Sequence, residues 1–149
     1  MHAVTRIAVV DDHPLYRAGI RQAVDAAFDM QVVAEGADAM DALHIAATSG
    51  SDMILLDLNI PGGGIDAARS ICQDFPDTKI VILTNSESEA NVATAMQLGA
   101  YGYIVKGIGG TELVSILRMV NGGESYVTPS LAAEVLRGMG RASHAEAAL

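Results

Sequence analysis

Polar side chains that follow short apolar runs of the sequence define the chemistry expected of this chain. Asp11 and Asp12 follow one such run and Asp57 follows another. Thr84 ends a third run and Lys106 follows a fourth. Three carboxylates in one place repel one another unless a cation lies among them, and ligands that are all oxygen favour Mg²⁺ over zinc or copper. An ammonium and a hydroxyl opposite that cation suit phosphoryl oxygens, so the residues predict phosphoryl transfer onto an aspartate.

The apolar runs, and the stretches between them, predict the elements that bring these side chains together. The runs are short, rich in β-branched residues and continuously apolar, which is typical of strands buried on both faces of a parallel sheet. They span residues 7–10, 30–34, 53–56, 80–83 and 101–105. Helical periodicity follows each run, so the pattern predicts an α/β sheet with helices on both faces. Ligands of such sheets bind beyond the carboxyl ends of the strands, where the polar side chains are expected.

The first predicted helix has the clearest start. Pro14 suits the first turn of a helix, and Leu15, Ala18, Val24 and Ala27 form its expected apolar face. His13 is expected to begin this helix with its side chain toward solvent.

Composition limits the class of protein. The chain has 149 residues with 18 acidic and 9 basic side chains, a formal charge of -9. This length fits one domain, and the acidic excess disfavours direct binding to nucleic acid phosphates. No apolar run approaches the roughly 20 residues that span a bilayer. The single cysteine, Cys72, fits a reducing cytoplasm, which is the expected location.

Four segments in order resemble the receiver domains of two-component response regulators, in particular the NarL/FixJ type. They are residues 9–20 (VVDDHPLYRAGI), 55–62 (LLDLNIPG), 82–84 (ILT) and 99–106 (GAYGYIVK). The resemblance implies a flavodoxin-like receiver fold, a doubly wound five-stranded parallel sheet with strand order 2-1-3-4-5. It also implies a receiver domain over residues 1–125 and a linker helix and tail over 126–149.

The resemblance implies a role for each site residue. Asp57 would accept a phosphoryl group from the phosphohistidine of a sensor histidine kinase. Asp11, Asp12, Asp57 and the backbone carbonyl of Asn59 would hold Mg²⁺. Lys106 would pair with the phosphoryl oxygens.

Two further residues would form the switch that the resemblance implies. The hydroxyl of Thr84 would move onto the phosphoryl group, and Tyr103 would rotate inward into the space that is vacated. This change would bias a two-state equilibrium at the face made by the fourth helix, fifth strand and fifth helix. A competing interpretation treats Tyr103 as a half-buried strand aromatic.

The sequence departs from the family pattern in three places. The loop of residues 61–66, with glycines at 62–64, is one residue short and is expected to lie differently beside Asp57. These glycines are interpreted as a plain flexible turn, because no Gly-Lys-Ser/Thr follows them. Asn85 stands where a small residue is usual, so it is expected to narrow access to the site and slow phosphorylation or hydrolysis. Gly107 replaces a proline whose preceding bond is often cis, which leaves the geometry of the Lys106–Gly107 bond open.

Two other functions compete with the phospho-accepting switch. A haloacid dehalogenase-type phosphatase also uses an aspartate, Mg²⁺ and a lysine, but it needs a second aspartate where this chain has Asn59. A protein-interaction module could keep the fold without phosphorylation, whether as a stand-alone or an atypical receiver. The switch itself would be a signalling phospho-acceptor and not a turnover enzyme.

The output is expected to lie outside this sequence. Residues 128–136 resemble the connection to a DNA-binding helix-turn-helix, so we expect a piece of a transcription factor that contacts DNA only through a missing C-terminal domain. Homodimerisation on phosphorylation is possible, and no membrane contact is expected. Residues 129–149 contain two basic and two acidic side chains, so the whole charge of -9 belongs to residues 1–128.

Overall fold

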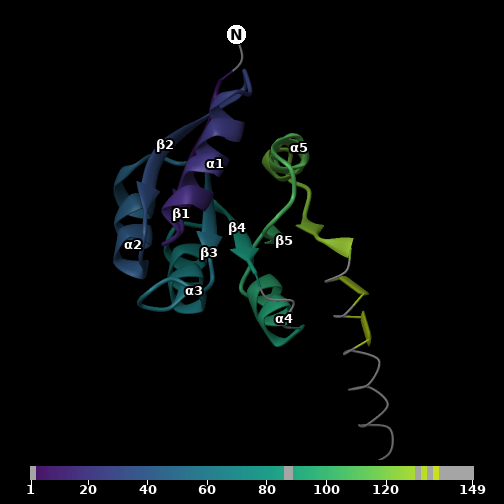
Figure 1. The fold of residues 1–149 in the computed structure, drawn as a ribbon. Coiled ribbons are helices and arrows are strands. Elements are labelled where there is room, and N and C mark those ends of the chain that lie inside the picture. Colours follow the sequence, from purple (N-terminus) through teal and green to yellow (C-terminus); the bar gives the residue numbers. More distant parts are fainter. Residues whose placement is uncertain (1–2, 86–88, 130–131, 134–135, 138–149) are drawn as a thin grey trace, which may run out of the picture.

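The computed structural model describes residues 3–85, 89–129, 132–133 and 136–137 (Figure 1). Its strands are β1 (Thr5–Val10), β2 (Met30–Gly36), β3 (Met53–Asp57), β4 (Lys79–Thr84), β5 (Gly102–Val105) and β6 (Tyr126–Val127). Its helices are α1 (Pro14–Asp25), α2 (Ala39–Thr48), α3 (Gly64–Asp74), α4 (Glu89–Gln97) and α5 (Gly110–Asn121). The strands form one parallel sheet in the order β2-β1-β3-β4-β5-β6. The predicted α/β receiver fold and the order 2-1-3-4-5 are therefore confirmed.

The prediction of five strands is wrong by one short strand at the edge. After α5 the chain returns alongside β5, where the N–H of Tyr126 donates to the carbonyl of Tyr101 at 2.9 Å and that of Thr128 to Tyr103 at 3.1 Å. These bonds satisfy the outer edge of β5, which would otherwise be unpaired. A strand of two residues is too short to show periodicity, so no pattern in the sequence predicts it.

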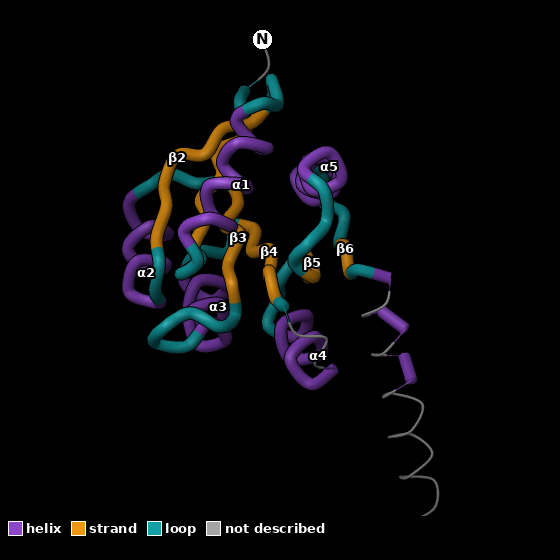
Figure 2. The backbone as a smooth tube through the Cα atoms, in the orientation of Figure 1, coloured by secondary structure: helices purple, strands orange, loops and turns teal. Residues whose placement is uncertain are grey.

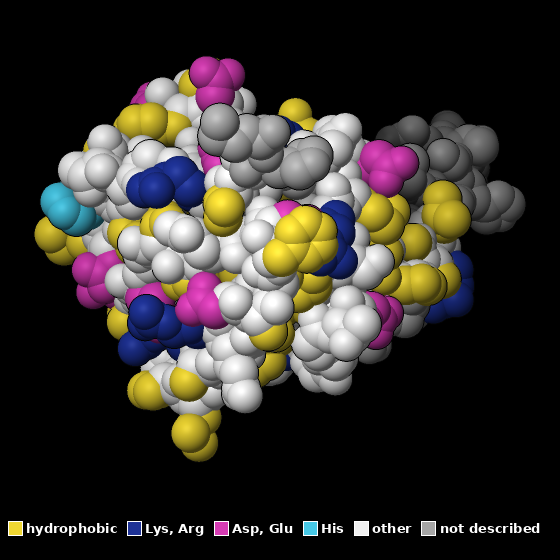
Figure 3. Space-filling view, turned by 90° about the horizontal axis from the view of Figure 1, so that it is seen from above, with side chains coloured by type: hydrophobic (Ala, Val, Ile, Leu, Met, Phe, Trp, Pro, Cys, Tyr) yellow, Lys and Arg dark blue, Asp and Glu magenta, His cyan; other side chains and the backbone are white. Residues whose placement is uncertain are grey.

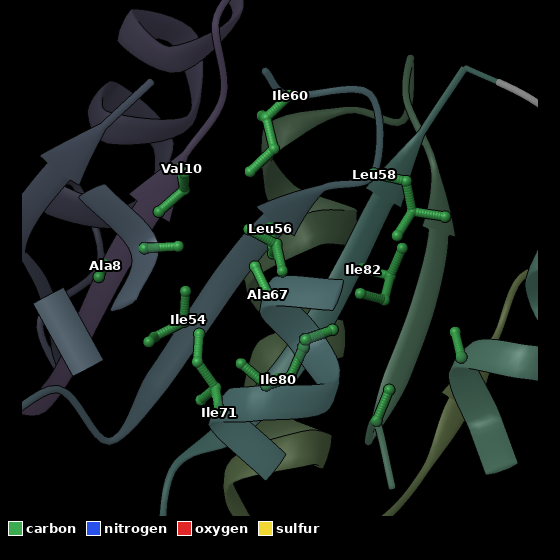
Figure 4. Close-up of a cluster of buried hydrophobic side chains, with 14 of the residues drawn as sticks. Ala8, Val10, Ile54, Leu56, Leu58, Ile60, Ala67, Ile71, Ile80 and Ile82 are labelled. Carbon is green, nitrogen blue, oxygen red and sulfur yellow. The ribbon is translucent and has the colours of Figure 1, made fainter. Parts of the chain in front are cut away.

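Two hydrophobic clusters lie on opposite faces of the sheet. Helices α1 and α5 cover one face, and α2, α3 and α4 cover the other (Figures 1 and 2). Successive strand residues alternate between the clusters, so Ile7 and Val9 face α1 and α5 while Ala8 and Val10 face the other layer. Figure 4 shows the second cluster, where Ile71 of α3 lies among the strand side chains. The inner strands β1, β3 and β4 are buried along almost their whole length, which explains their continuous apolar runs. The edge strand β2 is only partly buried, so the prediction of burial on both faces is wrong for residues 30–34.

The predicted apolar face of α1 is partly wrong. Leu15 is 90% exposed and Ala18 is also exposed. The packed face is instead formed by Tyr16, Ile20 and Val24, which recur every four residues. The side of α1 that faces the sheet therefore begins at Tyr16 and not at Leu15.

Gly19 occupies an exposed position within α1 where no backbone freedom is needed. A methyl group built there would meet nothing within 4 Å. Replacing Gly19 with alanine is expected to raise the free energy of unfolding by about 0.5–1 kcal/mol, because alanine loses less backbone entropy in a helix. Urea unfolding followed by far-UV circular dichroism measures this, and a decrease would contradict it.

The chain continues from β6 into the segment predicted as a linker. Thr128 satisfies the last backbone N–H of β5, because its hydroxyl oxygen accepts a hydrogen bond from the N–H of Val105 at 3.2 Å. The N–H of Ala132 donates to the carbonyl of Thr128 at 3.0 Å, as in a first helical turn. Leu131 and Val135, assigned to a linker helix, lie outside the described residues. The boundary at residues 125 and 126 stays a prediction.

The surface carries mixed charges. On the face seen in Figure 3, acidic and basic side chains lie next to one another with apolar side chains scattered among them. The net charge therefore does not form one continuous acidic patch on this face. Among the described residues, no helix has the length and apolar character needed to cross a membrane.

Candidate functional site

The carboxyl ends of three central strands bring Asp11, Asp57 and Lys106 together. Asp11 directly follows β1, Asp57 is the last residue of β3, and Lys106 directly follows β5. The Nζ atom of Lys106 lies 2.7 Å from Oδ2 of Asp11 and 2.8 Å from Oδ2 of Asp57. The exposed fractions of the three side chains are 5%, 0% and 1% for Lys106, Asp11 and Asp57. The site is therefore a buried cluster in which one ammonium serves two carboxylates.

Lys106 contacts the two carboxylates of this cluster in different ways. The contact of Lys106 with Asp57 is a hydrogen bond, and Oδ2 of Asp11, which has no hydrogen-bond partner among the described residues, is held by the charge of the same ammonium at 2.7 Å. Burial disfavours the ammonium, but the two carboxylates outweigh it and raise the pKa of Lys106 above its ordinary value. Lys106 is thus held charged, with spare acceptor capacity left at Asp11.

Asp12 and His13 complete the cluster at its exposed side. The Nδ1 atom of His13 lies 2.9 Å from Oδ1 of Asp11 and 3.2 Å from Oδ1 of Asp12. It also lies 3.7 Å from Oδ2 of Asp57. The prediction that His13 points to solvent is wrong: the side chain is 54% exposed, but the ring turns toward the carboxylates. His13 is the residue before α1, and the hydrogen bond between its Nδ1 atom and Asp11 Oδ1 holds the ring over the site.

The predicted metal ligands have the chemistry that a hard cation needs. One ligand atom from each of Asp11, Asp12, His13 and Asp57 lies within 4.8 Å of the others. Three of the four donors are carboxylates, and one buried oxygen of Asp11 lacks a hydrogen bond. Such an oxygen-rich set fits Mg²⁺.

The loop after β3 positions Asn59. Its N–H donates to Oδ1 of Asp57 at 2.9 Å, so the backbone of Asn59 lies at the site. The N–H of Gly64 donates to the carbonyl of Leu58 at 3.3 Å, which folds the short glycine loop back onto the strand end. The three glycines thus lie in a turn that is hydrogen-bonded to the site. A ligand role for the carbonyl of Asn59 stays a prediction.

The peptide bond between Lys106 and Gly107 is trans. No cis peptide bond occurs among the described residues, and Gly107 has a φ of 110°. Proline fixes φ near -65°, so the observed backbone could not hold a proline at this position. The N–H of Lys106 donates to the carbonyl of Thr84 at 2.8 Å, which fixes the end of β5 beside β4.

Thr84 and Tyr103 lie on neighbouring strands and are both completely buried. Burial raises the pKa of the Tyr103 hydroxyl, and the nearby Thr84 hydroxyl partly opposes that effect. Tyr103 belongs to the cluster that packs against α2, α3 and α4, so the interpretation of a half-buried aromatic is wrong. The two proposed switch residues are therefore neighbours, with Tyr103 in an inward position.

A pocket of about 490 Å³ opens above Lys106. Its lining consists of His13, Leu15, Tyr16, Asn85 and Lys106. Asn85 thus lies in the lining of this pocket, and its effect on access to Asp57 stays a prediction. Sequence reasoning assigned no role to Tyr16, although a first-turn residue of a helix that begins at a strand end is placed to reach such a site.

The fold and the cluster together define a class of protein: an α/β domain with an acidic site and a lysine at the strand ends. Residues 7–118 match the family described as the response regulator receiver domain, and the chain belongs to this family. It contains a receiver domain of the LuxR/NarL type of two-component response regulator, so the resemblance in the sequence is confirmed.

Individual relatives agree with this assignment. The chain is 36% identical over 131 residues to the response regulator GacA of Pseudomonas aeruginosa, covering 87% of this chain and 61% of GacA. It is 37% identical over 130 residues to the response regulator UvrY of Escherichia coli K12, covering 87% of this chain and 60% of UvrY. A LuxR-family two-component response regulator from Aurantimonas sp. SI85-9A1 superposes with a TM-score of 0.85 at 34% identity, covering 92% of this chain and 99% of that structure. The chain therefore spans less than two thirds of the length of GacA and UvrY.

Proposed function

We propose that this domain accepts a phosphoryl group on Asp57 from the phosphohistidine of a sensor histidine kinase, in a reaction that requires Mg²⁺. The observation that carries the proposal is the buried contact of 2.8 Å between Asp57 Oδ2 and Lys106 Nζ, at the strand ends where Asp11 also lies. A nucleophilic carboxylate with an ammonium beside it and a cation site next to it is suited to phosphoryl transfer. The opening above Lys106 supplies a route for the donor.

The metal would be held by Asp11, Asp12 and Asp57 together with the backbone carbonyl of Asn59. When bound, Mg²⁺ neutralises negative charge on the carboxylates and on the phosphoryl oxygens. The donor set described above fits this role, because it is dominated by carboxylate oxygens.

The chain's own residues carry the transfer. The Asp57 carboxylate supplies the electron pair of the new bond to phosphorus, while the bond from phosphorus to the donor's imidazole nitrogen breaks and the imidazole keeps that pair. Lys106 is already beside Oδ2 of Asp57 and pairs with the phosphoryl oxygens. Water later hydrolyses the acyl phosphate, so the domain catalyses only its own phosphorylation and dephosphorylation.

The switch would act through Thr84 and Tyr103. Movement of the Thr84 hydroxyl onto the phosphoryl group would favour the inward position of Tyr103. Because that ring is already buried, phosphorylation would stabilise a conformation that the protein can adopt without it.

Incubation with acetyl phosphate and Mg²⁺ tests the proposal. We expect the wild-type domain to gain the mass of one phosphoryl group, but to gain none when Mg²⁺ is chelated before the reaction. Asp57→Ala is expected to gain none in either condition. Intact-protein mass spectrometry measures this, and beryllofluoride binding followed by ¹⁹F NMR is a second readout. Equal behaviour of wild type and Asp57→Ala would instead favour an interaction module that is not phosphorylated.

The proposed output follows from the relatives. Because GacA and UvrY are longer than this chain, we propose a DNA-binding domain beyond residue 149 that controls transcription, with homodimerisation on phosphorylation. A cytoplasmic location is part of the same proposal. Gel-shift and sedimentation measurements on the full-length protein, with and without beryllofluoride, test the coupling.

A further inference from the structure

The aromatic ring of Tyr16 lies against the ammonium of Lys106. The Nζ atom is 4.6 Å from the centre of the ring, within the range of a cation–π interaction. Tyr16 belongs to the first turn of α1 and Lys106 follows β5, so the contact joins two distant parts of the chain. The Lys106 side chain is only 5% exposed, and such contacts are strongest where the cation is shielded from water.

The ring and the carboxylates hold the ammonium from different directions. Asp11 and Asp57 attract it with full charges, whereas Tyr16 attracts it with a neutral π face. Tyr16 packs against the cluster beneath α1 and α5, so its ring is fixed by the hydrophobic core. A lysine side chain has several freely rotating bonds, and a fixed ring beside its end restricts where the ammonium lies.

Tyr16 lies near the segment that follows the lysine. Burial raises the pKa of the Tyr16 hydroxyl, while the Lys106 ammonium and the backbone N–H of Gly107 act in the opposite direction. Tyr16 also lines a second pocket together with Ile108 and Gly110, at the start of α5. Tyr16 and Lys106 both line the pocket that opens above the site.

We propose that Tyr16 is a positioning residue that holds the Lys106 ammonium where it can pair with a phosphoryl group on Asp57. The inference rests on the proposed function of Asp57. An incoming phosphoryl group adds negative charge, so a third carboxylate in this place would repel it. A neutral ring holds the lysine without that repulsion, and it remains in place when the ammonium turns from the carboxylates to the phosphoryl oxygens.

The affinity of the wild-type domain and of Tyr16 variants for beryllofluoride, measured by ¹⁹F NMR in the presence of Mg²⁺, tests the proposal. Tyr16→Leu removes the π face, and we expect affinity to fall about five-fold, in line with a buried cation–π contact. Tyr16→Phe keeps the ring and is expected to restore affinity to within about two-fold of wild type. The maximal rate of labelling by acetyl phosphate should fall in Tyr16→Leu, while Mg²⁺ affinity, which depends on the carboxylates, should not change.

Tyr101 provides a matched control for a structural effect. It packs against the same cluster, and Lys79 lies 5.6 Å from the centre of its ring, at the amino end of β4 and away from the site. Tyr101→Leu should lower the free energy of unfolding by an amount similar to Tyr16→Leu but leave beryllofluoride affinity unchanged.

The possible outcomes separate this inference from the proposed function. If Tyr16→Leu binds beryllofluoride as wild type does while Asp57→Ala does not, the positioning role is wrong and the phospho-acceptor stands. Equal losses of affinity in Tyr16→Leu and Tyr101→Leu would also overturn the positioning role, because they would reflect general destabilisation. If wild type itself does not bind, the proposed function fails first.

Discussion

Replacing Lys106 with methionine is expected to lower the free energy of unfolding by about 3–5 kcal/mol when no divalent cation is present. The methionine keeps most of the side-chain volume and removes only the charge. Asp11 and Asp57 are buried and have Lys106 Nζ within 2.8 Å of each, so they would face each other with no cation between them. Removing one partner of a buried ion pair is costly because the remaining charge is left unpaired and out of water.

Mg²⁺ is expected to restore much of this loss. A divalent ion bound by the same carboxylates would supply the positive charge that the methionine lacks, and binding to the folded state alone stabilises it. Urea unfolding of wild type and Lys106→Met, each with chelator and with millimolar Mg²⁺, measures both effects. Lys79→Met is the matched control, since it makes the same change in net charge at the other end of the sheet. A similar loss in both variants, or a loss in Lys106→Met that Mg²⁺ does not reduce, would contradict the electrostatic explanation.

The difference in the free energy of unfolding between wild type and Lys106→Met should depend on pH in a definite direction. Because the pKa of Lys106 is raised in the folded state, its contribution is complete below the unfolded value, about 10.4, and is lost as pH rises through the raised pKa. The difference between wild type and Lys106→Met should therefore be constant from about pH 7 to 9 and shrink above about pH 10.4. A difference that already disappears near neutral pH would mean that Lys106 is not the source.

Sequence reasoning located the site because the topology of a parallel sheet fixes where strand ends meet. Asp11, Asp57 and Lys106 are far apart in the chain, yet each follows a buried run, and the rule about carboxyl ends was sufficient to place them together. Their roles came from the family resemblance, since a strand-end aspartate alone is more often a cap. The location of the site could be predicted from the sequence because it depends only on the hydrophobic pattern and on the topology of the sheet.

The features that were not predicted depend on side-chain orientation or on very short pairings. The orientation of the His13 ring follows from its hydrogen bond with Asp11, which periodicity does not report. The predicted face of α1 includes Leu15 and Ala18, which are exposed, because their apolar character does not show which way the helix turns on the sheet. Its other two members, Val24 and Ala27, do pack against the sheet. Strand β6 pairs through two residues only, and its hydrogen bonds are backbone bonds that no side chain marks.

Replacing Gly64 with alanine is expected to lower the free energy of unfolding by about 3 kcal/mol and to weaken Mg²⁺ binding. A methyl group at Gly64 would lie 2.5 Å from both the Cα atom and the carbonyl oxygen of Leu58. These are backbone atoms, so no change of rotamer relieves the contact and the loop itself must move.

The displaced segment connects the proposed phospho-acceptor Asp57 with a proposed metal ligand, Asn59, which is why both stability and Mg²⁺ binding should change. Leu58 lies between Asp57 and Asn59, and the Asn59 N–H now holds one oxygen of Asp57. Urea unfolding and Mg²⁺ titration by calorimetry measure the two effects, with Gly19→Ala as the control that adds the same methyl group in open space. If Gly64→Ala unfolds like Gly19→Ala, the glycine is not required by the close approach; if it is destabilised but binds Mg²⁺ normally, the loop does not position the site. We expect both quantities to fall together, because the Gly64 backbone is hydrogen-bonded to Leu58, which lies between Asp57 and Asn59.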